Sequence, residues 1–410
     1  MERHQAIVIG GGPAGLGAAI QLWHMGVKDI LILEREEFPG GILRQCIHEG
    51  FGLTRFGENL SGPEYAQRFL DQVQELGIPC RTGCTVLKLS ENRIVTAVSS
   101  QGLLELKGDA VLLAMGCRER TRGALAIPGS RPAGIYTAGV AQEYVNLRNT
   151  MIGHEVVILG SGDIGMIMAR RLTLEGAHVK AVYEVQPYPS GLPRNIEQCL
   201  NDYGVPLYLS RTVTDIHGRQ RLEGVTVSQV DAAMQPIPGT QEYVPCDTLV
   251  LSVGLIPAND LTYDSGLKLD PRTKGAIVDE HYQTSIPGVF AAGNVLHVHD
   301  LVDFVTLEAE ALASAAAEYI QAGTLPSCAL EVRAGPAVGH VIPQRISGHR
   351  AFTLSLRVKK PKRNAVLTVR QNGREVFRRT IPKALPAEML QVKLNSELLE
   401  THGDLEVDVE

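Results

Sequence analysis

Ile7-Val8-Ile9-Gly10-Gly11-Gly12-Pro13-Ala14-Gly15 decides the fold, because the chain repeats this pattern as Val157-Ile158-Leu159-Gly160-Ser161-Gly162-Asp163-Ile164-Gly165. Each copy places an apolar strand before a G-x-G-x-x-G turn and a helical stretch after it. A second apolar run then ends in an acid, Glu34 or Glu184, nineteen residues past the third glycine. The repeat predicts two strand-turn-helix-strand units of the doubly wound α/β type.

The spacing of these glycines is the one that dinucleotide binding requires. The first permits a tight turn, the second lets backbone amides approach a pyrophosphate, and the third lets helix and strand pack closely. The helix N-terminus then faces the phosphates, and an acid about 20 residues on can bind ribose hydroxyls. With 42 glycines in 410 residues, one such motif arises by chance roughly 0.4 times. Two copies with matching acids predict two dinucleotide sites.

Length and composition predict a globular protein of two or three domains. The chain is 44% hydrophobic and carries a net charge of −6, so nothing predicts nucleic acid binding. No apolar run of 18 or more residues predicts a membrane span, and the first strand starts by residue 6, which leaves no room for a signal peptide. Seven cysteines without a C-x-x-C pair indicate a reducing compartment. We therefore expect a cytoplasmic protein.

The repeat extends to whole domains. The buried strand and glycine at 110–116 are echoed at 248–254, and a third strand and glycine at 288–294 precede an alanine-rich helix. A strand and helix that follow a second domain usually return to complete the first. The expected boundaries are 1–118 with 285–325 for the first domain, 119–284 for the inserted second domain, and 331–410 for a C-terminal domain.

Residues 331–410 predict a small all-β domain. Apolar residues alternate with polar ones in several short runs, and Asn372-Gly373 is the best short-range signal for a type I′ hairpin. Three interpretations of its basic residues stay open: a solvated face, a docking surface for an acidic partner, or, for this module alone, nucleic acid binding. These residues are Lys359, Lys360, Lys362, Arg363, Arg370, Arg374, Arg378 and Arg379.

Two dinucleotide modules, the second inserted in the first, together with the closing segment Gly288-Val289-Phe290-Ala291-Ala292-Gly293-Asn294, resemble the pyridine nucleotide-disulfide oxidoreductase superfamily. The resemblance covers about residues 5–325 and implies FAD in the first module and NAD in the second. The residues implied for the ADP part of FAD are Gly10, Gly12, Gly15 and Glu34, and those for NAD are Gly160, Gly162, Gly165 and Glu184. Further cofactor-binding positions are Pro13, Ala14, Arg35, Gly41, Gly116, Asp163, Ile164, Gly254, Gly293, Asn294, Val305 and Thr306.

Two departures from that family change the expected chemistry. The closing motif of the family ends in Gly-Asp, whereas Asn294 follows Gly293 here. The helix after it, which we expect Asp303 to cap, implies a positive N-terminus near the flavin N1 and O2 atoms. Disulfide reductases of the family carry two cysteines, and Cys46 stands alone. Because a dithiol relay needs two sulfurs within bonding reach, we expect an oxidoreductase without a redox-active disulfide.

A narrower likeness concerns the segments 41–52, 115–120 and 296–303. They resemble FAD/NAD-dependent subunits that accompany a separate dehydrogenase of the glycerol-3-phosphate or amino-acid oxidase type, as in hydrogen cyanide synthase, opine oxidases and sarcosine oxidase. The resemblance implies electron transfer between NAD(H) and a partner flavin. Two alternatives remain: a stand-alone NADH-dependent reductase or oxidase, and a nucleotide-binding scaffold. The expected partner is a dehydrogenase subunit, and self-association of the chain is a further option.

Other chemistry is confined to two loops. Cys46 and His48 share a glycine-flanked loop that the resemblance places near the isoalloxazine, as a proton donor or flavin neighbour, and simple loop packing is the alternative. His297, His299, Asp300 and Asp303 form a short cluster without the further ligands of zinc or non-haem iron. We therefore expect no metal.

Overall fold

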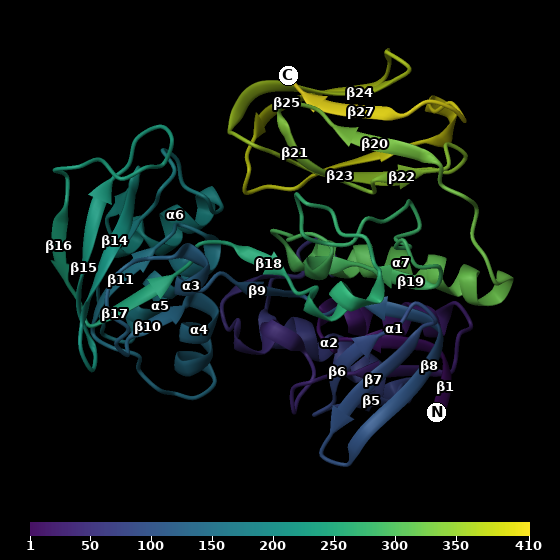
Figure 1. Cartoon of the computed structure of the whole chain (residues 1–410), viewed down its shortest axis with the longest axis horizontal. Coiled ribbons are helices and arrows are strands. Elements are labelled where there is room, and N and C mark those ends of the chain that lie inside the picture. The colour runs from purple at the N-terminus through teal and green to yellow at the C-terminus, as the bar shows by residue number, and fades with distance from the viewer. The chain divides into compact units, whose positions relative to one another are not determined.

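The computed structural model describes residues 1–263 and 265–410, which divide into two compact units (Figure 1). Unit 1 consists of Met1–Cys117 and Pro257–Glu410, and unit 2 consists of Arg118–Ile256. The chain passes between the units through β9 (Cys117–Glu119) and β18 (Leu255–Pro257), which pair as a two-stranded sheet. No helix among the described residues is long and apolar enough to cross a membrane.

The main sheet of unit 1 has the strand order β5-β2-β1-β8-β7-β6, with β19 beside β8. β1 runs parallel to β2 and β8, whereas β7 and β6 continue from β8 as an antiparallel meander. The strands are β1 (Glu2–Ile9), β2 (Ile30–Leu33), β5 (Cys80–Arg81), β6 (Thr85–Leu89), β7 (Ile94–Ser99), β8 (Gly102–Leu113) and β19 (Val289–Ala291). A parallel centre with an antiparallel extension matches the pattern that the sequence predicts.

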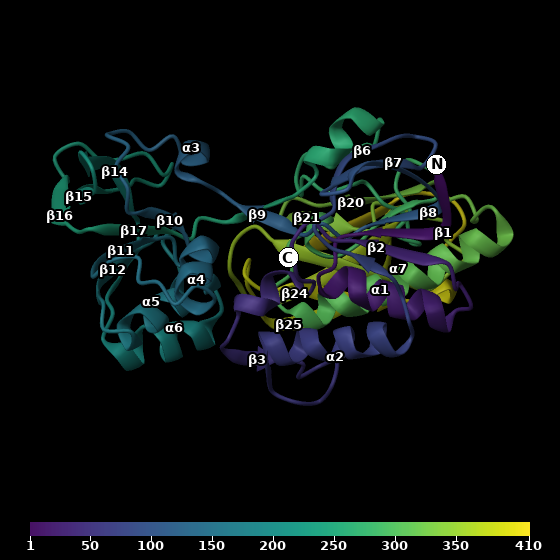
Figure 2. The same ribbon diagram turned by 90° about the horizontal axis from the view of Figure 1, so that it is seen from below.

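Three helices cover one face of this sheet: α1 (Pro13–His24), α2 (Gly62–Glu75) and α7 (Val302–Ala322). Figure 2 shows them gathered on one side of the strands. Side chains alternate across a strand, so Ala6 and Val8 of β1 pack beneath the helices while Ile7 and Ile9 pack into a second core. The short elements around the helices are η1 (Gly41–Gln45), β3 (Glu49–Phe51), β4 (Leu60–Ser61), η3 (Asp260–Ser265) and η4 (Gly293–Val295).

The second core corrects one expected boundary. Residues 257–284, which the sequence analysis assigns to the second domain, belong to unit 1. Leu267, Ala276 and Val278 are buried with Ile7 and Ile9 against the face of the sheet that the helices leave open. A sheet of this kind needs both faces covered, and this irregular segment covers the second one.

Unit 2 repeats the plan around a five-stranded parallel sheet of order β10-β17-β11-β12-β13. The strands are β10 (Ile135–Thr137), β17 (Thr248–Leu251), β11 (Glu155–Leu159), β12 (His178–Tyr183) and β13 (Leu207–Tyr208). An antiparallel meander of β14 (Arg211–Gly218), β15 (Leu222–Gln229) and β16 (Glu242–Pro245) follows. The helices are α3 (Arg122–Leu125), α4 (Ala138–Asn146), α5 (Asp163–Leu174), α6 (Pro193–Cys199) and the short η2 (Asn201–Tyr203).

The C-terminal part of unit 1 is a module of two packed sheets with its own core. One sheet has the order β22-β20-β27-β24-β25 and the other β21-β23-β26. The elements are β20 (Leu330–Ala334), β21 (Val338–Ile342), β22 (Arg345–Ile346), β23 (Phe352–Val358), β24 (Lys362–Gln371), β25 (Arg374–Ala384), β26 (Leu390–Leu394), η5 (Ser396–Leu398) and β27 (Leu405–Val409).

The hairpin of this module forms where the sequence predicts it. Asn372 and Gly373 have φ angles of 52° and 77° between β24 and β25, and a type I′ turn requires positive φ at both positions. The module also contributes to the rest of unit 1. Ile342 is buried in the core beneath the main sheet, and the Gln344 side chain accepts a hydrogen bond from the Val278 amide at 2.9 Å.

Candidate functional site

The first glycine turn joins β1 to α1 and is shaped by close backbone contacts. Gly10 has a φ of 109°, and a Cβ there would overlap the Ala114 carbonyl. A Cβ on Gly15 would overlap the Gly10 carbonyl oxygen. Helix α1 begins directly at Pro13, and its N-cap Gly12 offers no side chain to the free amides of the first turn. The N-terminus of α1 is therefore built to receive an anion.

Gly12 differs from its neighbours because the space at its Cα is open. A Cβ there would meet only the Cα of Gly41, at 3.8 Å. Gly41 faces it from the 3-10 helix η1 with a φ of 59°. Two opposed glycines beside a helix N-terminus leave room for a phosphate group to reach backbone amides. The residues therefore fit the pyrophosphate of a dinucleotide.

Glu34 directly follows β2 beside the turn and is buried. Its Oε2 accepts a hydrogen bond from the Gly11 amide at 2.7 Å, and its Oε1 accepts one from the Glu36 amide at 2.8 Å. These bonds orient the carboxylate next to the Gly12 opening, where its remaining lone pairs can serve a ribose hydroxyl. Arg35 lies on the surface and pairs with Glu36.

The closing segment returns to the same turn. A Cβ on Gly293 would lie 3.1 Å from the Ala14 Cβ and 3.0 Å from Val305 Cγ1, so these three predicted residues are neighbours. Thr306 lies against α1 and bonds with the hydroxyl of Tyr65 at 2.9 Å. The structure thus brings together the predicted residues of α1, η4 and α7, which are distant in the sequence. Gly116 follows β8 with a φ of 70° and open space at its Cα.

Asn294 is fully engaged by its surroundings. Its Oδ1 accepts a hydrogen bond from the His299 amide at 2.9 Å, and its Nδ2 donates to Cys117 Sγ at 3.7 Å. The amide therefore organises the loop that leads to α7. An aspartate in its place could not donate to the sulfur.

Asp303 does not cap α7 as the sequence analysis expects, since Leu301 is the N-cap and Asp303 lies within the first turn. Its buried carboxylate accepts hydrogen bonds from the amides of Gly52, Thr54 and Arg55 at 3.1, 3.2 and 2.7 Å. A carboxylate in the first turn still complements the helix dipole. Its additional effect is to fasten the loop at 52–55 to the start of α7.

Cys46 and His48 lie in the loop that precedes α2. The Cys46 thiol donates a hydrogen bond to the Ile42 carbonyl at 3.3 Å, and burial raises its pKa to about 12. The His48 ring lies 4.9 Å from that of Phe51, with Nδ1 3.0 Å from the Glu49 carbonyl. All seven cysteines are free, and a protonated thiol of this kind is a poor nucleophile.

The second glycine turn, in unit 2, packs against Ser252, which the sequence analysis missed. A Cβ on Gly160 would overlap the Ser252 carbonyl, and one on Gly162 would lie 2.9 Å from Ser252 Oγ. That hydroxyl accepts a hydrogen bond from the Gly165 amide at 3.0 Å. Ser252 directly follows β17, at the carboxyl edge where doubly wound sheets bind ligands. Gly254 continues this segment with a φ of 99°.

Glu184 occupies the place in unit 2 that Glu34 has in unit 1, with more partners. Its Oε2 accepts from the Ser161 amide, the Ser161 hydroxyl and the Ser190 hydroxyl at 3.0, 2.6 and 2.8 Å. Its Oε1 accepts from the Gln186 amide at 2.9 Å. The two serines were missed by sequence reasoning, although Ser161 stands where the first motif has Gly11.

Asp163 opens α5 and holds the same loop in place. Its Oδ1 accepts hydrogen bonds from the Leu192 amide at 2.7 Å and the Asn195 side chain at 2.6 Å. Ile164 is the next residue of the helix and packs against the core of unit 2. The predicted residues of this turn therefore form one cluster at the N-terminus of α5. Segment 190–195, which leads into α6, lies beside them.

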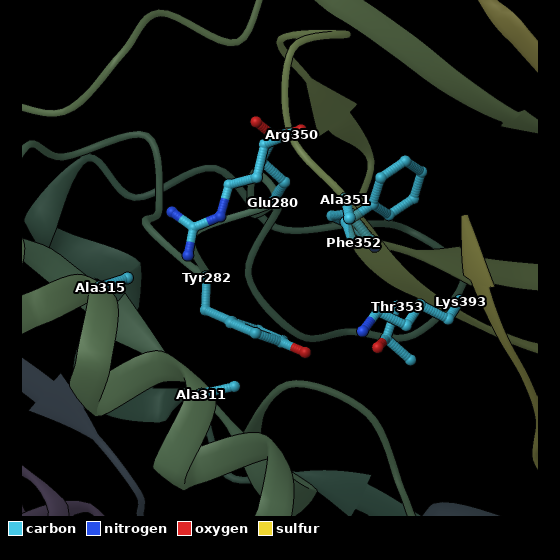
Figure 3. A pocket seen from close by; sticks show the side chains of 10 residues that line it. Glu280, Tyr282, Ala311, Ala315, Arg350, Ala351, Phe352, Thr353 and Lys393 are labelled. Atoms are coloured by element: carbon cyan, nitrogen blue, oxygen red, sulfur yellow. The ribbon is translucent and has the colours of Figure 1, made fainter. Parts of the chain in front are cut away.

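A pocket of about 140 Å³ lies elsewhere in unit 1 and contains none of the predicted site residues. Figure 3 shows it between α7, which contributes Ala311 and Ala315, and the C-terminal module, which contributes Arg350 and Lys393. Two of its charged lining residues have partners: Glu280 accepts a hydrogen bond from Ser347, and Arg350 pairs with Glu318. We assign no cofactor to this pocket.

Comparison with known proteins is consistent with this geometry. Residues 4–318 match the family model described as pyridine nucleotide-disulphide oxidoreductase. The chain is 26% identical over 325 residues to the HcnB component of hydrogen cyanide synthase from Pseudomonas protegens, covering 70% of this chain and 65% of that protein. It is 23% identical over 313 residues to one of the subunits of opine oxidase from Agrobacterium tumefaciens, covering 71% and 61%. The chain thus spans less than two thirds of these two relatives.

Among solved structures, thioredoxin reductase of T. acidophilum matches with a TM-score of 0.63 at 21% identity, covering 78% of this chain and 99% of that one. This likeness confirms the α/β fold. The family match covers most of the chain, so the chain belongs to the pyridine nucleotide-disulphide oxidoreductase family. It is an oxidoreductase, with FAD and a nicotinamide dinucleotide as cofactors, as the sequence predicts.

The protonated state of Cys46 gives a direct prediction. Because a pKa of about 12 leaves about a thousandfold less thiolate at pH 7 than an ordinary cysteine, we expect Cys46 to resist iodoacetamide in the native protein. Labelling should accelerate with rising pH and become fast in urea, as measured by mass spectrometry of the peptide that contains Cys46. Rapid labelling of native protein at pH 7 would show that the thiol is activated.

Proposed function

We propose that this chain transfers electrons between NAD(H) and a partner redox centre by way of its FAD, as one component of a larger dehydrogenase. The observation that carries the proposal is that the chain has two glycine turns, and that in each turn the second residue is bonded to a buried glutamate. These turns would form two dinucleotide sites in one chain. Neither turn contains a pair of cysteines.

In unit 1 the residues around Gly12 would hold FAD. The open amides of α1 and the opposed glycines Gly12 and Gly41 would bind the pyrophosphate, and Glu34 would bind the ribose. The first turn of α7 would place its amides near the flavin, with Asp303 fixing the loop at 52–55 beside it. When bound, FAD accepts a hydride from reduced nicotinamide and passes its electrons to an acceptor.

Cys46 and His48 remain candidates for groups near the flavin. Cys46 stays protonated at neutral pH because its pKa is raised to about 12, so any part it plays is that of a neutral hydrogen-bond donor. His48 is half-buried and could hold a proton beside the flavin. We assign neither a covalent step.

In unit 2 the residues around Gly162 would hold NAD. We favour NAD over NADP because Glu184 carries a negative charge where the 2′-phosphate of NADP would lie. The nearby cation Arg211, whose amide donates to the Glu184 carbonyl, has its guanidinium 3.2 Å from Glu242. A paired arginine offers little to a phosphate.

The partner would be a separate dehydrogenase subunit. The two relatives above belong to hydrogen cyanide synthase and opine oxidase, each as one of several subunits, which supports a multi-subunit assembly. We propose β25 as its docking element, since it is the edge strand of its sheet. Arg374, Arg378, Arg379 and Lys383 are exposed along it. Such an edge offers free backbone groups and positive charge to an acidic segment.

The two proposed cofactor sites can be tested one at a time by substituting the N-cap glycine of each turn. Gly12 has φ −83° and ψ −172°, which valine adopts readily, and its Cα faces open space. We expect Gly12→Val to fold without FAD, because the side chain fills the phosphate space. Gly162→Ala in the second turn should keep FAD and lose rapid reduction by NADH. Flavin absorbance and anaerobic stopped-flow measure both results, and normal FAD content in Gly12→Val would refute the assignment.

The choice of nicotinamide is tested at Glu184. We expect the wild-type flavin to be reduced faster by NADH than by NADPH. Glu184→Gln removes the charge and should narrow that preference by roughly tenfold, which corresponds to about 1.4 kcal/mol. Glu175→Gln, on the exposed end of α5, makes the same change in net charge and should leave the preference unaltered. Equal reduction of the wild type by both nucleotides contradicts the assignment.

The docking role of β25 is tested by charge reversal. We expect Arg379→Glu combined with Lys383→Glu to keep FAD content and reduction by NADH, and to lose co-purification of the native dehydrogenase partner. Arg219→Glu combined with Lys268→Glu changes exposed residues elsewhere by the same charge and should not affect co-purification. Unchanged co-purification by the β25 variant would place the interface elsewhere on the chain.

A further inference from the structure

A buried group of imidazoles and one carboxylate lies where the loop after η4 meets α7. His297 Nε2 is 2.7 Å from Glu308 Oε2, and His299 Nε2 is 3.5 Å from the same oxygen. The three side chains are at most 3% exposed. His340 of β21 lies beside them, with its ring centroid 5.8 Å from that of His297.

The hydrogen bonds around His299 fix the position of its proton. Asn294 Oδ1 accepts from the His299 backbone amide at 2.9 Å, so that atom must be the amide oxygen. His299 Nδ1 is 3.3 Å from the same oxygen and can bond to it only as a donor. In the neutral ring, Nε2 then carries a lone pair. That lone pair and Glu308 Oε2 are two electron-rich atoms in a buried space.

Further nitrogens in this group lack partners. His297 Nδ1, His299 Nε2 and His340 Nε2 are buried and make no hydrogen bond among the described residues. Buried imidazole nitrogens without partners are costly unless something outside the chain satisfies them.

Glu308 and the His299 ring each bind a second group through an atom that does not face the site, as metal ligands usually do. His299 bonds in this way to Asn294. Glu308 Oε1 accepts a hydrogen bond from the Gly293 amide at 2.7 Å, which leaves Oε2 directed to the histidines. The site therefore presents one carboxylate and two imidazole rings whose potential ligand atoms lie within 4.8 Å of one another.

We propose that His297, His299 and Glu308 bind one Zn²⁺ ion, with a water molecule at the fourth position. Ligands of a tetrahedral zinc at about 2.0–2.1 Å lie about 3.4 Å from one another, and the 3.5 Å between His299 and Glu308 matches this spacing. His297 is closer because its Nε2 proton now bridges to Glu308. The ion replaces that proton, which moves to Nδ1. The zinc thus satisfies the lone pair of His299 Nε2 but leaves His297 Nδ1 without an acceptor among the described residues.

The ion would fasten the loop of His297 and His299 to α7. The same loop is bound to the C-terminal module, where Arg357 of β23 pairs with Asp300 at 3.1 Å. It also begins at Gly293, beside the first glycine turn. The zinc would thus be structural, and it would stabilise the segment that closes the first dinucleotide site. The proposal does not depend on the direction of electron flow or on the partner.

The test measures metal content in the full-length, FAD-loaded protein by mass spectrometry, before and after incubation with Zn²⁺ and removal of the excess. We expect about one zinc per chain. His299→Gln and Glu308→Gln, the latter retaining an acceptor for Gly293, should each lower zinc affinity by about tenfold or more. His281→Gln is the matched control, because Glu280, His281 and Cys328 form the other described group with metal-binding geometry.

A second measurement distinguishes the loss of zinc binding from misfolding of the variants. A strong chelator should lower the thermal midpoint of the wild type, and added Zn²⁺ should restore it, whereas the His299 and Glu308 variants should respond to neither. Wild type that holds no zinc even after incubation would overturn the proposal. Zinc that is lost only in the His281 variant would also overturn it.

Discussion

Both proposed dinucleotide sites depend on a single kind of hydrogen bond, between a buried carboxylate directly after a strand and the amide of the second residue in a glycine turn. Glu34 makes it with Gly11 at 2.7 Å, and Glu184 makes it with Ser161 at 3.0 Å. A charged acceptor makes this bond stronger than a neutral one. It ties the second strand of each unit to the turn between first strand and helix, and it places a negative charge beside the helix N-terminus.

The two turns differ in how much room this bond leaves. In unit 1 the second residue is glycine, and a Cβ on the neighbouring Gly12 would meet only the Cα of Gly41. In unit 2 the second residue is Ser161, whose hydroxyl bonds Glu184 and accepts from the Ser190 amide. Segment 190–195, which leads into α6, is thereby bound to the turn. The site that we propose for FAD has no such segment bonded across it in this way, whereas the site that we propose for the nicotinamide dinucleotide does.

Local signals predicted much of this fold. The glycine turns, the strands that lead into them and the Asn372-Gly373 hairpin appear where the sequence places them, because each depends on a few adjacent residues. Segment 257–284 was assigned to the wrong unit, because it has no regular period and is ordered by packing against a distant sheet. Asp303 was taken for a cap because its three amide partners lie about 250 residues away. Ser252 was missed because the Gly165 amide that it binds lies 87 residues away in the sequence. Glu308 was missed although Gly293 and His297 lie only 15 and 11 residues before it, because no local pattern indicates that this loop folds back onto α7.

The central claim is that one chain carries FAD and accepts electrons from NADH onto it. The most direct measurement is an anaerobic titration of the FAD-loaded, full-length protein with NADH, followed by flavin absorbance. We expect the oxidised flavin spectrum to bleach in proportion to added NADH, with an end point at one equivalent per flavin. An oxidised spectrum that persists in excess NADH would contradict the account.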